Sequence, residues 1–211
     1  MPSRAPHILL TAFDAFGGHA INSSAAVVEA LAATSAWRDR LIWRILPTVY
    51  ADAGRVVREL IRDERPNAVL CLGLCAQSSS ILLERLAINL NDDTCGDNAG
   101  DRATARPIDP AGPVGYFSTL PLWAMHAALR EKGIPVGWSN HAGTYVCNHV
   151  FYTARHAIEQ LDLHTPCGLV HVPMLSDTIS LAMLIGAAEE MLRVIEIERS
   201  AVSDQRSARR T

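Results

Sequence analysis

The stretch HAGTYVCNH, residues 141–149, contains the residue with the clearest potential for chemistry, Cys147. A glycine turn precedes this cysteine, and the apolar spacing after it predicts a helix that begins near Cys147. Unpaired N–H groups and the dipole at a helix start favour negative charge, and so they favour a thiolate over a thiol. The backbone N–H groups from Tyr145 to Asn148 could also donate to the oxygen of a tetrahedral intermediate. This position therefore suits a nucleophile.

A nucleophilic thiol needs a base, and His171 is the best placed of the eight histidines because it interrupts the apolar run GLVHVP. His149 is closer to Cys147 in sequence, but two residues along a helix point in different directions. Glu84, a carboxylate within the apolar run LLERLAINL, could accept a hydrogen bond from the base and orient it. Glu84, Cys147 and His171 therefore form a candidate catalytic triad.

Each member of this candidate triad also has a purely structural interpretation. Cys147 could be a small apolar side chain in the core, as a lone cysteine on a helix usually is. His171 could be a core histidine with its hydrogen bonds satisfied, and Glu84 could pair with Arg85 at a strand edge. No cysteine and histidine have the usual spacing of zinc ligands, so we expect no metal.

The elements that must position these residues alternate along the chain. We expect strands at residues 7–13, 41–46, 67–74, 82–90, 134–140 and 168–173, and helices at 22–34, 52–64, 120–133, 147–161 and 180–198. The connection from Asn91 to Ser118 is rich in Gly, Pro and Asp, and connections of that length are often functional. This order predicts an α/β fold with a largely parallel sheet, in a single domain over residues 1–198 with a polar, disordered tail at 199–211.

Ligand sites in open parallel sheets lie beyond the carboxyl ends of the strands. Residues 13–18 follow the first expected strand, Cys147 follows the strand at 134–140, and His171 lies near the end of its own strand. We therefore expect these three distant segments to meet at one edge of the sheet. The turn FDAFGG within the first of them lacks the spacing of a GxGxxG dinucleotide site, so a plain tight turn is the other interpretation.

The composition limits the partners and the cellular location that we expect for this protein. A net charge of −3 argues against binding of nucleic acid by bulk electrostatics, and no run approaches the roughly 20 apolar residues of a membrane span. The five cysteines are odd in number and lack paired CxxC spacing, which suits free thiols in the cytoplasm. We expect no nucleic-acid partner, no membrane association, no metal and no cofactor.

Six ordered blocks resemble the motifs of pyroglutamyl peptidase type I, the pyrrolidone-carboxylate peptidase family, over nearly the whole chain. They are TAFDAFGGHAIN, LLERLAINLND, GDNAG, DPAGPVGYFSTLPL, SNHAGTYVCNH and GLVHVPML. The resemblance implies a cysteine peptidase that removes an N-terminal 5-oxoprolyl residue through a thioester, with catalytic Glu84, Cys147 and His171. It also implies an α/β/α sandwich of the phosphorylase/hydrolase-like type, a cytosolic location, frequent assembly into homo-oligomers such as tetramers, and no metal.

The same resemblance implies a pocket for the lactam ring. The aromatic pair Phe13 and Phe16 would surround the ring, and Tyr145 and Val146 match family positions that line it. Asn22, Thr48 and Leu74 match further family positions, although Asn22 is equally readable as a plain helix cap. Aromatic faces and a few backbone hydrogen bonds suit a small neutral ring that has no free amine.

Several positions depart from the family pattern. The run GLCAQS stands where bacterial members commonly read GQAGGR, so Leu74 replaces a glutamine and Ser78 an arginine. Leu82 and Leu83 replace a Ser/Thr-Pro pair, and Thr94 stands where many members carry an arginine proposed to help at the oxyanion. Two alternatives follow: a paralogue of low activity that binds pyroglutamyl ligands, and a hydrolase of a different lactam or acyl amide.

Overall fold

The computed structural model describes residues 7–208, with side chains up to Ala201. Its centre is a six-stranded sheet in the order β2-β1-β3-β8-β4-β7. The strands are β1 (Ile8–Phe13), β2 (Leu41–Leu46), β3 (Ala68–Leu74), β4 (Ile81–Glu84), β7 (Val136–Ser139) and β8 (Cys167–Val172). Strands β1, β3 and β8 are buried along their whole length, which is why they read as continuous apolar runs and not as alternating ones.

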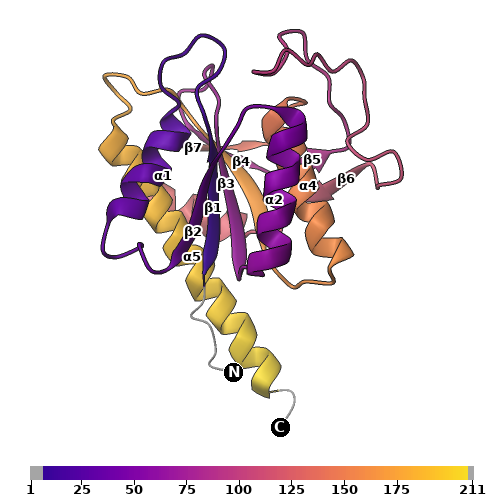
Figure 1. Cartoon of the computed structure of the whole chain (residues 1–211). Helices are drawn as coiled ribbons and strands as arrows, with labels where there is room; N and C mark the ends of the chain where they lie inside the picture. The colour runs from indigo at the N-terminus through magenta and orange to yellow at the C-terminus, as the bar shows by residue number, and fades with distance from the viewer. Residues whose placement is uncertain (1–6, 209–211) are drawn as a thin grey trace.

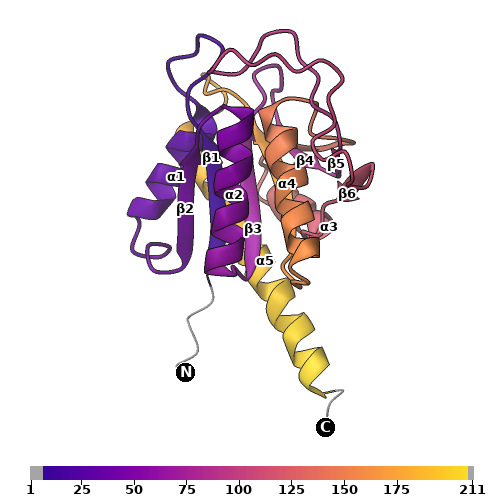
Figure 2. The ribbon, with the colours of Figure 1, turned by 45° about the vertical axis from the view of Figure 1, so that its right-hand side comes forward.

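Helices cover both faces of this sheet (Figures 1 and 2). On one face α1 (Ser23–Ala33) and α3 (Leu122–Glu131) pack against α5 (Leu181–Ala208), and on the other α2 (Tyr50–Glu64) packs against α4 (Val146–Gln160). Each face has its own apolar core. The predicted α/β fold with a largely parallel sheet is confirmed, and the three layers form an α/β/α sandwich.

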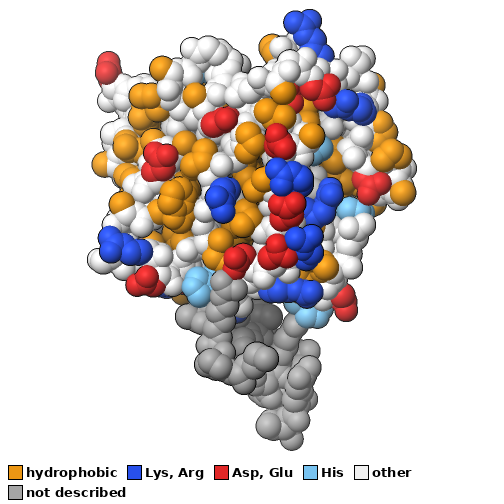
Figure 3. All heavy atoms as spheres, in the orientation of Figure 1, with side chains coloured by type: hydrophobic (Ala, Val, Ile, Leu, Met, Phe, Trp, Pro, Cys, Tyr) orange, Lys and Arg blue, Asp and Glu red, His pale blue; other side chains and the backbone are white. Residues whose placement is uncertain are grey.

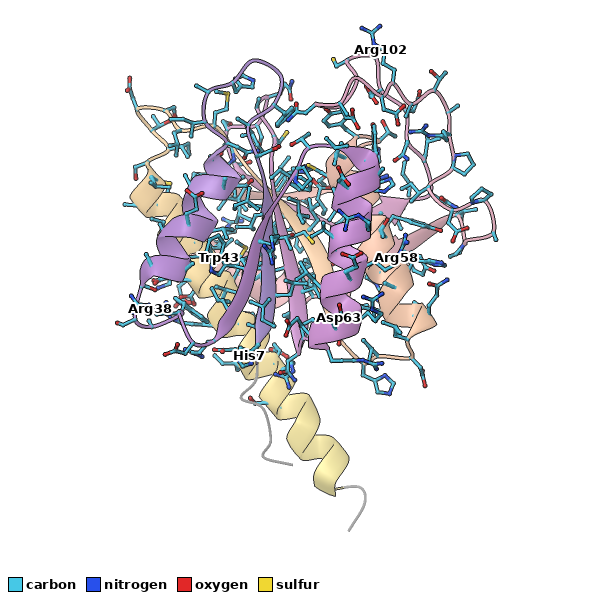
Figure 4. All side chains as sticks on the ribbon, in the orientation of Figure 1. His7, Arg38, Trp43, Arg58, Asp63 and Arg102 are labelled. Atoms are coloured by element: carbon cyan, nitrogen blue, oxygen red, sulfur yellow. The ribbon has the colours of Figure 1, made fainter. Side chains whose placement is uncertain are left out.

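Helix α2 has one buried face and one exposed face, as the amphipathic pattern of its sequence predicts. Val57 and Ile61 are buried against the sheet, whereas Arg55 pairs with Asp52 and Glu59 on the exposed side. Figure 3 shows acidic and basic side chains mixed over this helix, and Figure 4 labels Arg58 and Asp63 among them. Because exposed pairs of this kind contribute little each, the buried stripe holds the helix in place.

The run LLERLAINL does not form the single strand that we expected. It divides at Arg85 into β4, which lies in the main sheet, and β5 (Leu86–Ile88), which pairs with β6 (Gly115–Phe117) in a separate two-stranded sheet. Strand β6 lies inside the segment 91–118 that we read as one long connection. A strand's partner depends on residues far away in the sequence, so an apolar run cannot reveal where a strand changes sheets.

Strands β4 and β7 also run against the direction of the other four. Strand β4 pairs antiparallel with β8 and parallel with β7. The carboxyl end of β7 therefore does not lie at the edge where β1, β3 and β8 end, so the rule that we applied to Cys147 was wrong for this strand. The chain returns to that edge along β5, where the Ala142 N–H donates to the Leu86 carbonyl and the Asp92 N–H to the Thr144 carbonyl.

The last helix is longer than the sequence suggested. Helix α5 continues past residue 198 to Ala208, through residues that we expected to begin a disordered tail, and its end projects beyond the sheet (Figure 1). Once a helix is nucleated, it extends at low cost in free energy through residues of high helix propensity such as Ala, Arg and Gln. Residues 209–211 of the expected tail lie outside the described residues.

Candidate active site

The structure brings the three members of the candidate triad together. His171 lies near the end of β8, and its Nδ1 is 2.7 Å from Oε1 of Glu84, the last residue of β4. Glu84 is 1% exposed and His171 is 8% exposed, so this hydrogen bond is shielded from water. Arg85, the other partner that we considered for Glu84, makes different contacts. Its guanidinium lies over the Trp138 ring and donates a hydrogen bond to Asn140.

Cys147 is the second residue of α4 and is 8% exposed. The residue before the helix, Tyr145, makes no side-chain cap hydrogen bond. The N–H groups of a helix's first turn have no partner within the helix, so here they remain available for an oxyanion, as the sequence suggested. The candidate nucleophile thus lies at a positively polarised helix start.

The electrostatics of His171 follow from these two neighbours. Burial by itself lowers the pKa of the imidazole, but hydrogen bonds to Cys147 and Glu84 and the negative charges of both groups outweigh burial. Together they raise the pKa of His171 to about 10. The imidazolium form of His171 is therefore favoured at neutral pH.

Gly73 on β3 makes the contact between the cysteine and the histidine possible. A Cβ atom at this position would lie 2.9 Å from Sγ of Cys147 and 3.0 Å from Nε2 of His171. Real Cβ atoms do not approach other heavy atoms so closely, so any side chain here would displace one of the two groups. The sequence analysis missed this residue. Its signal was a glycine inside an apolar strand, which often marks a close approach.

We expect Gly73→Ala to lower kcat/KM by roughly 100-fold or more, because a misplacement of about 1 Å at reacting groups can cost that much. Steady-state assays with a pyroglutamyl substrate would measure the loss. Gly137→Ala is the matched control, because a Cβ at this glycine in β7 would meet only ordinary contacts at 3.7 and 3.8 Å. Full activity in folded Gly73→Ala protein would contradict the tight approach described here.

Aromatic side chains surround the start of α4. Phe13 is 1% exposed and shares a buried cluster with Val146 and Cys147. The ring of Phe16 lies 5.9 Å from that of Tyr145, measured between centroids. Phe16 and Tyr145 are therefore in contact beside the start of α4, and Phe13 and Val146 belong to the same buried cluster as Cys147. Contact of these four residues with a substrate stays a prediction.

The other three residues assigned to that pocket have clear structural partners. Asn22 caps α1, because its Oδ1 accepts from the Ser24 N–H at 3.0 Å, as the alternative interpretation predicted. Thr48 donates its N–H to Asp14 Oδ1 at 2.8 Å. Leu74 ends β3, where it lies opposite Val172 of β8, and is 5% exposed. Contact of these three with a substrate stays a prediction.

Two acidic residues of the segment 91–118 hold that segment near the site, and the sequence analysis missed both. Asp93 accepts a 2.6 Å hydrogen bond from the hydroxyl of Tyr50, and Asp97 accepts the Tyr50 N–H at 2.9 Å. Tyr145 donates its hydroxyl to the Gly96 carbonyl at 2.9 Å. Burial and these acidic neighbours raise the pKa of Tyr145 to about 12, so its phenol stays protonated and remains a donor.

His149 has the structural role that its position suggested. Its Nδ1 lies about 3 Å from the side chain of Asn91, and burial lowers the pKa of the imidazole to about 4. The ring therefore stays neutral and links α4 to the start of the long segment. It takes no part in the cluster around Cys147.

Among the side chains that the structure describes, those of residues 7–201, no three His, Cys, Asp or Glu are grouped in a way that could hold a metal ion. In the same part of the chain, every helix is too short or too polar to cross a membrane. All five cysteines are free thiols.

Comparison with known proteins finds relatives that match over most of the chain. The pyroglutamyl peptidase family profile matches residues 6–202. The pyrrolidone-carboxylate peptidase of Bacillus mycoides is 39% identical over 173 residues, which are 82% of this chain and 80% of that protein. That of Bacillus thuringiensis subsp. konkukian is 34% identical over 203 residues, 90% of this chain and 94% of that protein.

Solved structures give the same result for the fold. A mutant pyrrolidone carboxyl peptidase from Pyrococcus furiosus superposes with a TM-score of 0.86 at 30% identity, covering 91% of this chain and 99% of that one. Pyroglutamyl peptidase I from Bacillus amyloliquefaciens superposes with a TM-score of 0.84 at 29% identity, covering 92% of this chain and 98% of that one.

Proposed function

This chain belongs to the pyroglutamyl peptidase family of cysteine peptidases, and we propose that Glu84, Cys147 and His171 remove an N-terminal pyroglutamyl residue from peptides. The observation that carries this assignment is the buried hydrogen bond between His171 and Glu84, with Cys147 at the start of α4 on the other side of the same imidazole. A nucleophile, a base and a group that orients the base are the three parts that acyl transfer needs.

In the proposed reaction the Cys147 thiolate attacks the carbonyl carbon of the pyroglutamyl residue, and a C–S bond forms. The first-turn N–H groups of α4 stabilise the oxyanion. As the tetrahedral intermediate collapses, the C–N bond breaks and the imidazolium of His171 gives its proton to the leaving amine. Water then gives a proton to neutral His171 and attacks the thioester, which releases 5-oxoproline and restores the thiolate.

The lactam ring fits the aromatic surroundings of Cys147. A pyroglutamyl residue has no ammonium group, so its site needs no carboxylate at the ring and can be mainly apolar. Phe13, Phe16, Tyr145 and Val146 supply such surfaces beside the nucleophile. Asn22, Thr48 and Leu74 are proposed to complete the wall of this pocket.

The wild-type protein is expected to release the fluorophore from pyroglutamyl-aminomethylcoumarin. A panel of N-acyl substrates and other lactams, assayed in parallel, would separate this activity from that of a hydrolase with different preference, which the Leu74 departure suggests. Calorimetry with 5-oxoproline would identify a binding paralogue, which the altered run Leu74–Ser78 suggests. Absence of turnover by folded protein would contradict the peptidase assignment.

The ligands, the cellular location and the oligomeric state that we propose are those that the family resemblance implies. Its ligands are pyroglutamyl peptides, and the five free thiols suit the reducing cytoplasm. Phe117 and Trp123 are 72% and 74% exposed, and apolar surface of this kind often marks a contact between proteins. We therefore retain assembly into homo-oligomers as a prediction that sedimentation of the purified protein would check.

A further inference from the structure

A hollow lies between the loops that follow β1 and β8. Its volume is about 250 Å³, and its walls are His19, Ala20, Ile21 and Ser23 on one side and Met174 and Leu175 on the other. The Ser23 hydroxyl donates to the Pro173 carbonyl at 2.7 Å and so joins the two walls. Figures 1 and 2 show the two loops at the same end of the sheet.

Neighbouring residues connect the walls of this hollow to the candidate active site on both sides. One wall begins three residues after His171, the proposed proton donor. On the other side, the ring of Phe16 lies 5.9 Å from Tyr145 in one direction and 6.4 Å from His19 in the other. Phe16 therefore stands between the surroundings of Cys147 and the hollow.

The direction of the proposed reaction decides which part of a substrate would reach the hollow. His171 must lie next to the leaving amine to protonate it, so the residue that follows the pyroglutamyl group lies on the His171 side of the scissile bond. The chain from His171 leads through Pro173 directly to Met174 and Leu175. In this assignment the lactam ring lies on the other side, against the faces of Phe16 and Tyr145 that border the start of α4.

We propose that this hollow binds the side chain of the residue that follows the pyroglutamyl group, and that it favours a large apolar side chain. The inference rests on the proposed peptidase function. Ile21 is 64% exposed, and Met174 and Leu175 are each 37% exposed, so an apolar side chain would cover surface that is otherwise in water. Among the described residues, those that line the hollow include no Asp, Glu, Lys or Arg. The volume suits one side chain of the size of leucine or phenylalanine.

The test compares two uncharged substrates that differ only at this residue, pyroglutamyl-leucine amide and pyroglutamyl-glycine amide. We expect the wild-type kcat/KM to be about tenfold higher for the leucine substrate, because apolar contacts of this size discriminate by that order. Ile21→Ser combined with Leu175→Ser should bring the ratio close to one. Ile197→Ser is the matched control, because Ile197 is 67% exposed on α5 and does not line the hollow, and it should leave the ratio unchanged.

Calorimetry on the Cys147→Ala variant with the same two peptides gives a second readout that needs no turnover. Tighter binding of the leucine peptide, lost in the Ile21→Ser and Leu175→Ser background, would support the assignment. Equal kcat/KM values for the two substrates, or a preference that survives both serine substitutions, would overturn it and leave the peptidase function standing. A protein that neither hydrolyses nor binds either peptide would overturn the role of the hollow and the peptidase function together.

Discussion

Cys147→Ala is expected to abolish hydrolysis of pyroglutamyl substrates, with a loss on the order of 10⁶-fold, because the bond-forming atom is removed. The substitution removes only one sulphur atom from a residue that is 8% exposed, so the loss of stability should be small and the fold should persist. Release of aminomethylcoumarin measures the loss, and circular dichroism and thermal unfolding check the fold.

The other thiols of the chain provide the control for this prediction. Cys167 is fully buried at the start of β8, and burial raises the pKa of its thiol well above the usual range. Cys167→Ala should therefore leave the pH dependence and most of the activity intact, while costing stability in the core. Peptide mapping after brief treatment with iodoacetamide should find Cys147 alkylated and Cys167 unmodified. Turnover by Cys147→Ala near the wild-type rate would exclude this cysteine as the nucleophile.

Glu84→Gln is expected to lower kcat/KM by roughly 10² to 10⁴-fold, since an uncharged side chain no longer stabilises the imidazolium or fixes its orientation. The same substitution should change the pH profile. On the alkaline side, the wild-type rate should stay level until the pH rises through about 10, where His171 loses the proton that it gives to the leaving amine. Without the charge and hydrogen bond of Glu84, the pKa of His171 falls, so the alkaline limb should move to lower pH.

Glu59→Gln serves as the matched variant, because Glu59 is an exposed glutamate on α2 that pairs with Arg55. It should leave both the rate and the pH profile unchanged. A Glu84→Gln enzyme that is slow but keeps the alkaline limb of the wild type would contradict the electrostatic role of Glu84. A merely structural role would change stability without moving that limb.

The sequence alone indicated most of the elements in their order and the residues of the candidate triad. Buried parallel strands need apolar side chains on both faces, so residues 8–13 and 168–172 were recognisable as strands without their partners. A histidine in one such run and a glutamate in another stand out for the same reason. Cys147 was identified by its place at a helix start, which is a local property of the chain.

The tertiary structure decided how those residues meet, because strand partners and directions depend on contacts between distant segments. It divided the run at Arg85 between two sheets and turned β4 and β7 against the other strands. It also selected Gly73 as the point where the sulphur and the imidazole approach, and Asp93 and Asp97 as anchors of the long segment. In a sequence, a glycine indicates backbone freedom and an aspartate indicates negative charge. Only the folded chain determines which neighbours these residues contact.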